Sequence, residues 1–248
     1  MKISPLTGEA FVGKHLVPGV TLSADVLAGY YNQNALDNKE GFDANDWADP
    51  EQMYNQFHFL TDHIDLHEKS LLDVGSGNGL LFSYLNEKKI ILTDATAIDL
   101  ASEQIAILKR LHPNVSAIVD DFFKYEYEQT FDVITLFGVA PCLKFIFPDK
   151  DRIGSLMKLL DRAVRYAREA VCFSFLNKNC YEGSDAEGYE YTYFYPEEIC
   201  TLLSGGAYEI STAKNDLVTN CILHVNDTND EPFRFNLTRI DSVFGLFR

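Results

Sequence analysis

Glycines and a carboxylate stand together in one short segment of the sequence, which reads Asp73-Val74-Gly75-Ser76-Gly77-Asn78-Gly79. Glycine lets a backbone approach a ligand closely, and the free N–H groups at the start of a helix receive polar or anionic groups. Because the segment follows an apolar run, we predict a sharp turn from a strand into a helix. At the carboxyl end of a parallel sheet, such a turn predicts a site for a nucleotide-like ligand.

The spacing of these glycines separates two classes of ligand. A dinucleotide-binding turn has the pattern G-x-G-x-x-G, which would place the third glycine at position 80. That position is Leu80, and the third glycine comes one residue earlier, at Gly79. An NAD-dependent oxidoreductase is therefore disfavoured but kept as an alternative. A tight turn that binds no ligand is the simplest competing interpretation.

A second acidic position lies at the predicted end of the next strand. Asp99 follows Gly79 by 20 residues. A carboxylate there can accept hydrogen bonds from both ribose hydroxyls of a bound nucleoside. Asp is also a good helix-capping residue, so Asp99 could begin the helix that follows, and the two roles are compatible.

A third group, Asp120-Asp121-Phe122, follows the next predicted strand. A carboxylate at this place could accept a hydrogen bond from an adenine amino group, and the backbone N–H of the following residue could donate to a ring nitrogen. We expect one of the two acids to be a solvated surface residue. Nothing in the residues themselves favours Asp121 over Asp120 for the adenine contact, and only resemblance to a known family favours Asp121.

Short apolar runs alternate with helical patterns from residue 70 onward, which predicts strand-helix-strand units around a parallel sheet. Strands are predicted at residues 71–74, 96–99, 116–119, 131–136 and 170–175, and an antiparallel pair at 208–212 and 221–225. Helices are predicted from residue 50, at 80–85, at 101–111, over about 153–167 and from residue 196. Residues 233–237 alternate and could add an edge strand.

Residues 1–48 have little periodicity and several glycines and prolines, so we predict an irregular N-terminal arm or lid rather than a second domain. Residues 49–248 then form one ligand-binding domain. Aromatic residues in the arm and in residues 189–195 could pack the lid or line a substrate pocket, and both interpretations stay open.

These motifs, in this order, resemble those of class I S-adenosylmethionine-dependent methyltransferases from about residue 70 to residue 225. The resemblance implies an α/β, Rossmann-like three-layer sandwich, with a mostly parallel seven-stranded sheet, a reversed last strand and helices on both faces. It implies S-adenosylmethionine as methyl donor and S-adenosylhomocysteine as product.

The resemblance also implies roles for individual residues. Asp73 and the backbone of the glycine segment, including Gly75, Ser76, Gly77 and Gly79, would hold the methionine portion. Asp99 and Leu100 would contact the ribose, Asp121 and Phe122 the adenine, and Phe137 would lie beneath the ligand. A bacterial branch of the family often carries Arg just before the aromatic residue at 57, whereas this chain has Gln56, so no cofactor contact is predicted from that helix.

Composition limits the choice of partner and compartment. The chain has 248 residues, of which 46% are hydrophobic and 23% charged, and a formal charge of −16, which disfavours nucleic acid. We see no apolar run long enough to span a membrane and no signal peptide, and the five cysteines form no C-x-x-C pair, so we expect a cytoplasmic protein. The histidines have no metal-ligand spacing, and no metal is expected.

The function predicted from the sequence is methyl transfer from S-adenosylmethionine to a small-molecule acceptor by in-line displacement. The acceptor would lie beneath the N-terminal arm and residues 177–195. A non-catalytic module that binds the cofactor for regulation is the main alternative. The sequence identifies neither a general base, nor the acceptor, nor the oligomeric state.

Overall fold

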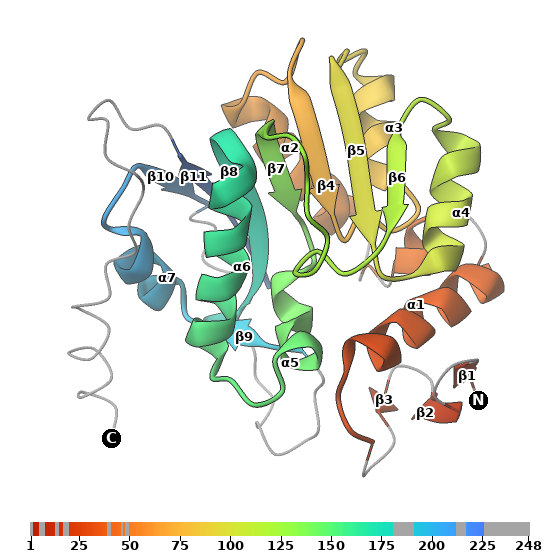
Figure 1. Cartoon of the computed structure of the whole chain (residues 1–248). Coiled ribbons are helices and arrows are strands. Elements are labelled where there is room, and N and C mark those ends of the chain that lie inside the picture. The colour runs from red at the N-terminus through yellow and green to blue at the C-terminus, as the bar shows by residue number, and fades with distance from the viewer. Residues whose placement is uncertain are drawn as a thin grey trace, which may run out of the picture.

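A computed structural model describes residues 2–4, 8–12, 15–16, 20–38, 41–45, 47, 50–180, 191–211 and 217–225. Its centre is a sheet with the strand order β6, β5, β4, β7, β8, β11, β10 (Figure 1). The bounds are β4 (Ser70–Val74), β5 (Asp94–Asp99), β6 (Ser116–Val119), β7 (Phe131–Leu136), β8 (Ala167–Asn177), β10 (Tyr208–Ile210) and β11 (Val218–His224).

The direction of the strands agrees with the predicted topology. The pairs from β6 to β8 are all parallel, whereas β11 runs antiparallel to both β8 and β10. The seven predicted strands and the reversed last strand are therefore confirmed. A short additional strand, β9 (Tyr193–Phe194), pairs in parallel with the end of β8.

Helices cover both faces of this sheet and make the three predicted layers. Helices α2 (Pro50–His63), α3 (Leu80–Glu87) and α4 (Ser102–Leu111) pack on one face, and α6 (Arg152–Tyr166) and α7 (Pro196–Leu203) on the other (Figure 1). Neighbouring strand residues point to opposite faces, so Leu71 packs with the first set of helices and Leu72 with the second. All of β4 is buried, as expected for the central strand of a covered parallel sheet.

The prediction that residues 1–48 are irregular is wrong. They include a small antiparallel sheet of β1 (Lys2–Ser4), β2 (Gly8–Val12) and β3 (His15–Leu16), then helix α1 (Ala24–Asn38) and the 3-10 turn η1 (Phe42–Asn45). Buried residues of α1 include Val26, Leu27, Ala28, Tyr30 and Ala35, which do not form a single stripe. The helix packs on several neighbours at once, so its sequence lacks the one-sided periodicity that predicts a surface helix.

Parallel strands bring their carboxyl ends to one edge of the sheet. The two short elements after β7, η2 (Ala140–Cys142) and α5 (Leu143–Ile146), lie at this edge together with α1 (Figure 1). Another 3-10 turn, η3 (Lys178–Cys180), follows β8. The predicted edge strand at 233–237 lies outside the described residues. In the described part of the chain, none of the helices has the length and apolar character required to cross a membrane.

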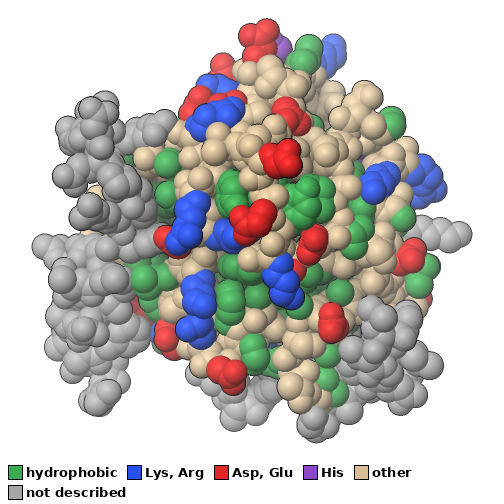
Figure 2. Space-filling view, in the orientation of Figure 1, with side chains coloured by type: hydrophobic (Ala, Val, Ile, Leu, Met, Phe, Trp, Pro, Cys, Tyr) green, Lys and Arg blue, Asp and Glu red, His purple; other side chains and the backbone are tan. Residues whose placement is uncertain are grey.

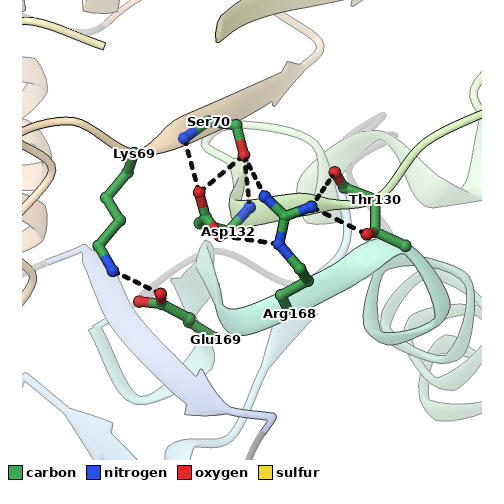
Figure 3. Close-up of polar contacts among 6 residues, drawn as sticks. All are labelled: Lys69, Ser70, Thr130, Asp132, Arg168 and Glu169. Carbon is green, nitrogen blue, oxygen red and sulfur yellow. Dashed lines mark hydrogen bonds and ion pairs between the residues drawn. The ribbon is translucent and has the colours of Figure 1, made fainter. Parts of the chain in front are cut away.

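Charged side chains form a network of hydrogen bonds and ion pairs at the amino ends of the parallel strands (Figure 3). Asp132 accepts hydrogen bonds from the backbone N–H and hydroxyl of Ser70, at 2.8 and 2.9 Å, and from Arg168 Nε at 2.8 Å. Lys69 pairs beside them with Glu169. These residues join the amino ends of β4, β7 and β8, so the polar network contributes to the sheet far from the glycine turn.

Candidate functional site

A cavity of about 490 Å³ lies where the carboxyl ends of the parallel strands meet. Its walls come from the strand ends of the sheet, from α1 and η1 of the N-terminal segment, and from α2, η2 and α5. The predicted cofactor residues that line it are Asp73, Gly75, Ser76, Gly77, Asp99, Leu100, Asp121, Phe122 and Phe137. Residues distant in the sequence are thus brought together in one site.

The glycine turn is shaped by close approaches of other segments. Gly77 has φ +54°, a left-handed conformation that disfavours other residues, and a Cβ there would fall 2.2 Å from Asn45 Oδ1. At Gly75, with φ +67°, a Cβ would fall 2.7 Å from a methyl group of Val139. Both positions therefore require glycine, because the backbone runs against the N-terminal segment on one side and the loop after β7 on the other.

Gly79 is the one predicted cofactor residue that is not among the cavity-lining residues. It precedes α3 with φ +88°, and a Cβ there would meet His112 Cδ2 at 2.8 Å. His112 Nε2 lies 3.0 Å from Ser83 Oγ. The packing of α3 against the end of α4 therefore explains this glycine without a ligand.

Asp73 is the residue before the last in β4, and its buried carboxylate lines the cavity. Thr135 Oγ1 donates a hydrogen bond to Asp73 Oδ1 at 2.7 Å. Burial, with a smaller contribution from the negative charge of Asp99, raises the pKa of Asp73 to about 7. Its ionised form would be favoured by a cation beside it, such as an ammonium group.

Asp99 joins the glycine turn to the start of α4. Its Oδ2 accepts the Gly77 N–H at 2.8 Å, and its Oδ1 accepts the Ala101 N–H at 2.8 Å. The N-cap residue of α4 is Ala101, so Asp99 acts just before the helix rather than as its cap. Desolvation raises the pKa of Asp99, although these backbone donors oppose the shift. The Leu100 N–H is a third backbone donor to this carboxylate. A carboxylate offers about four lone-pair sites, so Asp99 can still accept a hydrogen bond from a ligand hydroxyl.

The paired acids after β6 differ in exposure, as expected. Asp120 is exposed and accepts the Asp121 N–H at 2.7 Å. Asp121 is buried, accepts the Phe123 N–H at 2.9 Å and pairs with Lys124 at 3.1 Å. Its carboxylate therefore fixes the turn that presents Phe122 to the cavity.

Two aromatic rings from distant segments also border the site. Phe122 is stacked by the Arg162 guanidinium, 5.5 Å from its ring centre. Phe137, at the end of β7, packs on Phe57 of α2 with 5.8 Å between ring centres. Both predicted aromatic residues lie against the cavity, and α2 contributes a wall to it.

Gln104, for which the sequence predicts no role, attaches the N-terminal segment to the site. Its amide donates to the Ala44 carbonyl at 2.5 Å and to the Tyr31 carbonyl at 3.4 Å. The Asn45 side chain donates to Asn78 Oδ1 at 2.8 Å, and Asn32 Oδ1 accepts the backbone N–H of Glu103 at 2.9 Å. Amide side chains on a predicted amphipathic helix carry no sequence signal for such contacts.

Three buried polar atoms along the cavity have no hydrogen-bond partner among the described residues: Ser76 Oγ, Gln56 Oε1 and Gln104 Oε1. Buried polar groups are nearly always paired in native proteins, so these atoms point to a polar ligand. Gln56 is 1% exposed. No cofactor contact is predicted for this helix from the sequence, whereas Gln56 lies in the cavity wall.

Residues 71–166 match the model of a protein family described as a methyltransferase domain. The search of curated proteins found no match. Many solved structures match the fold.

Among these structures is magnesium protoporphyrin IX methyltransferase from Synechocystis with S-adenosylmethionine bound, with a TM-score of 0.57 and 11% identity over 84% of this chain and 99% of that one. Phosphoethanolamine N-methyltransferase 1 from Haemonchus contortus has a TM-score of 0.59 and 15% identity over 91% of this chain and 54% of that one. The plantazolicin methyltransferase BpumL has a TM-score of 0.52 and 16% identity, covering 80% and 91%. At these identities the likeness shows the fold.

Proposed function

We propose that the chain is a class I S-adenosylmethionine-dependent methyltransferase and that it methylates a small molecule held in the cavity beside the cofactor. The observation that carries the proposal is the convergence of the glycine turn, Asp99 and Asp121 on one cavity. S-adenosylmethionine consists of a methionine portion, a ribose and an adenine. These three parts match the ends of the successive strands β4, β5 and β6.

S-adenosylmethionine supplies an activated methyl group on a sulfonium, and S-adenosylhomocysteine is the product. The residues present fit this ligand, because the turn at Gly77 excludes side chains and Ser76 Oγ is buried without a partner. In the proposed arrangement Asp73 faces the ammonium of the methionine portion and Asp99 accepts from the ribose. Asp121 and Phe122 border the adenine, and Phe137 supports the ligand.

The protein's contribution to an in-line displacement is alignment and the exclusion of water. Proximity and orientation account for ~7–11 kcal/mol of a barrier when reacting groups are held in place. Phe57 and Phe137 form an apolar wall, while α1 forms another part of the enclosure. The proposed lid at residues 1–48 would thereby act as part of the binding domain at 49–248.

A small acceptor fits a cavity of about 490 Å³ better than a macromolecule does. The chain carries a net charge of −16, and Figure 2 shows Lys and Arg side chains interspersed with Asp and Glu over the face it displays. Neither feature favours nucleic acid. No two of the five cysteines, all of which lie in the described part of the chain, form a disulfide, which fits the proposed cytoplasmic location.

Calorimetry with S-adenosylmethionine and S-adenosylhomocysteine tests the proposal. We expect both to bind with micromolar affinity and NADH not to bind, and S-adenosylhomocysteine to accumulate when an acceptor is supplied. Failure of both adenosyl ligands to bind would remove the proposal. Tight binding without turnover on a broad panel of acceptors would instead favour the regulatory module.

A further inference from the structure

The cavity has two ends of different chemistry. The carboxylates that line it are Asp73 in β4, Asp99 at the end of β5, and Asp120 and Asp121 after β6. Another part of the wall, which we call the acceptor end, is formed by Leu27, Tyr31, Cys142, Ile146 and Tyr191. These five residues belong to one apolar cluster in which α1 packs on η2 and α5.

No lysine, arginine or histidine lines the cavity in the part of the chain that the structure describes. A phosphate, sulfate or carboxylate placed at the acceptor end would therefore lose its hydration without gaining a positively charged partner. Burying an uncompensated charge is costly, so this end selects against anionic groups. Its apolar side chains favour an apolar body instead.

The acceptor end also offers poor proton acceptors. Its ionisable groups are the phenols of Tyr31 and Tyr191 and the thiol of Cys142, types that ordinarily stay protonated at neutral pH. Tyr31 OH lies 3.9 Å from Cys142 Sγ, which in turn lies 3.8 Å from the Gly138 carbonyl.

The histidines of the neighbouring helix do not supply a base either. His58 and His63 lie on α2 but neither lines the cavity. His58 Nδ1 lies 3.0 Å from Tyr84 OH, and His63 Nδ1 lies 2.8 Å from the Phe59 carbonyl. A hydroxyl acceptor would need a base to remove its proton, whereas a thiol that ionises near neutral pH or a weakly basic nitrogen needs none.

We infer that the acceptor is an apolar small molecule without an anionic substituent, methylated on sulfur or nitrogen that holds a free lone pair near neutral pH. The inference rests on the proposed function. The lone pair forms the new bond to the methyl carbon, the methyl–sulfonium bond breaks, and its electron pair stays on the sulfur as a neutral thioether. A thiol acceptor gives its proton to water before transfer, and the positive charge of the donor sulfonium balances the thiolate so formed. A nitrogen acceptor that carries a proton gives it to water afterwards.

Three aromatic probes of similar shape test this inference with the full chain and saturating S-adenosylmethionine. 4-Methylbenzenethiol has an apolar body and a readily ionised thiol. 4-Mercaptobenzoate adds a carboxylate, and 4-methylphenol replaces the thiol by a hydroxyl. We expect S-adenosylhomocysteine to form at least about tenfold faster with 4-methylbenzenethiol than with either other probe.

Equal or faster turnover of 4-mercaptobenzoate or 4-methylphenol would overturn the inference. So would a lack of turnover of 4-methylbenzenethiol by protein that binds S-adenosylhomocysteine in calorimetry. If S-adenosylhomocysteine itself does not bind, the proposed function fails instead, so the two failures are distinguishable.

A charge placed at the acceptor end gives a second, independent test. Ile146→Arg puts a cation on α5, and it should raise the rate with 4-mercaptobenzoate relative to 4-methylbenzenethiol by about tenfold. Leu27→Arg places the same charge on α1, in case the first variant does not fold. Ile91→Arg is the matched control, since Ile91 is 64% exposed and does not line the cavity, and should leave the ratio unchanged. An unchanged ratio in folded variants at both cavity positions contradicts the inference.

Discussion

At the scale of single residues, the candidate site combines a carboxyl that is costly to ionise with a turn that tolerates no side chain. Asp73 is buried with one hydrogen-bond donor, Thr135, and its pKa is raised to about 7. A cationic group of the ligand would offset the desolvation penalty and favour the ionised form of the carboxylate. The raised pKa of Asp73 therefore favours a positively charged partner beside this carboxyl.

The pH dependence of binding follows from this raised pKa. Below about pH 7 the Asp73 carboxyl is mostly protonated and has to lose its proton before it can pair with the ligand ammonium. We expect the affinity for S-adenosylhomocysteine to rise by roughly tenfold between pH 6 and pH 8, measured by calorimetry. Asp73→Asn should weaken binding and remove most of this dependence, whereas Asp120→Asn, at an exposed neighbour, should retain it. A pH dependence that persists in Asp73→Asn would assign it to another group.

The glycine turn gives a second prediction at this scale. Gly77→Ala forces a left-handed conformation on alanine and drives its Cβ toward Asn45 Oδ1, 2.2 Å away. We expect a loss of about 1–3 kcal/mol in the free energy of unfolding and weaker binding of S-adenosylhomocysteine. Gly41→Ala is the matched control, because Gly41 also has positive φ but no atom within 4 Å of its added Cβ. Equal losses in the two variants would show that the contact with Asn45 is unimportant.

At the scale of elements, the N-terminal segment is bound to the cavity wall by side-chain amides as well as by the apolar cluster of α1, η2 and α5. Gln104 on α4 donates to the carbonyls of Ala44 and Tyr31. Because these contacts join η1 and α1 to the same helix, the segment should be ordered or released as a unit.

Gln104→Ala removes both donors, and leaves the Ala44 carbonyl without its short hydrogen bond. We predict faster hydrogen exchange across α1 and η1, and weaker binding of S-adenosylhomocysteine by about 1–2 kcal/mol. Gln33→Ala serves as control, since the Gln33 side chain makes an exposed contact with Asp37 on the same helix. If exchange in α1 is the same in both variants, Gln104 does not anchor the segment.

The difference between predicted and observed elements has a physical cause. Strands such as β4 and β7 were predicted because buried parallel strands are continuous apolar runs. Helix α1 was missed because it is packed on several sides and contains Gly29, Asn32 and Asn34 among its buried residues. Tertiary contacts stabilise it, and contacts between distant segments leave no periodic pattern in the sequence.

The residues of the candidate site also fall into those that the sequence predicts and those that it does not. The strand-end acids and glycines follow rules of local spacing, and all of those predicted except Gly79 line the cavity. Gln56 and Gln104 owe their positions to packing between helices, and amide residues on an amphipathic pattern read as ordinary surface. Gly79 has the correct spacing for a ligand turn, yet the approach of His112 accounts for it.

At the scale of the whole molecule, the candidate ligand site and a stabilising polar network lie at opposite ends of the parallel strands. The cavity lies at the carboxyl ends of the strands, and the network of Asp132, Ser70 and Arg168 joins their amino ends (Figure 3). The central strand β4 passes between the two regions. Changes in the network should therefore alter stability while leaving ligand affinity nearly unchanged.

Asp132 tests this separation through its own titration. Its hydrogen bond with Arg168, assisted by those from Ser70, lowers the pKa of Asp132 below its ordinary value. A carboxyl with a lowered pKa stabilises the fold above its unfolded pKa, about 4, and this stabilisation is lost as the pH falls through the lower folded value. We expect Asp132→Asn to reduce the free energy of unfolding by about 1–3 kcal/mol at neutral pH, with the difference from wild type shrinking below about pH 4.

Denaturant unfolding over this pH range measures the change in stability. Calorimetry with S-adenosylhomocysteine at neutral pH measures the change in ligand affinity. Asp161→Asn breaks the exposed pair with Arg165, whose side chains are 54% and 69% exposed, and should cost less than about 0.5 kcal/mol. The Asp132 variant should bind S-adenosylhomocysteine within about twofold of wild type, because no residue of the network lines the cavity. A large loss of affinity would mean that β4 transmits strain from one edge to the other, and the two regions would then have to be treated as one coupled unit.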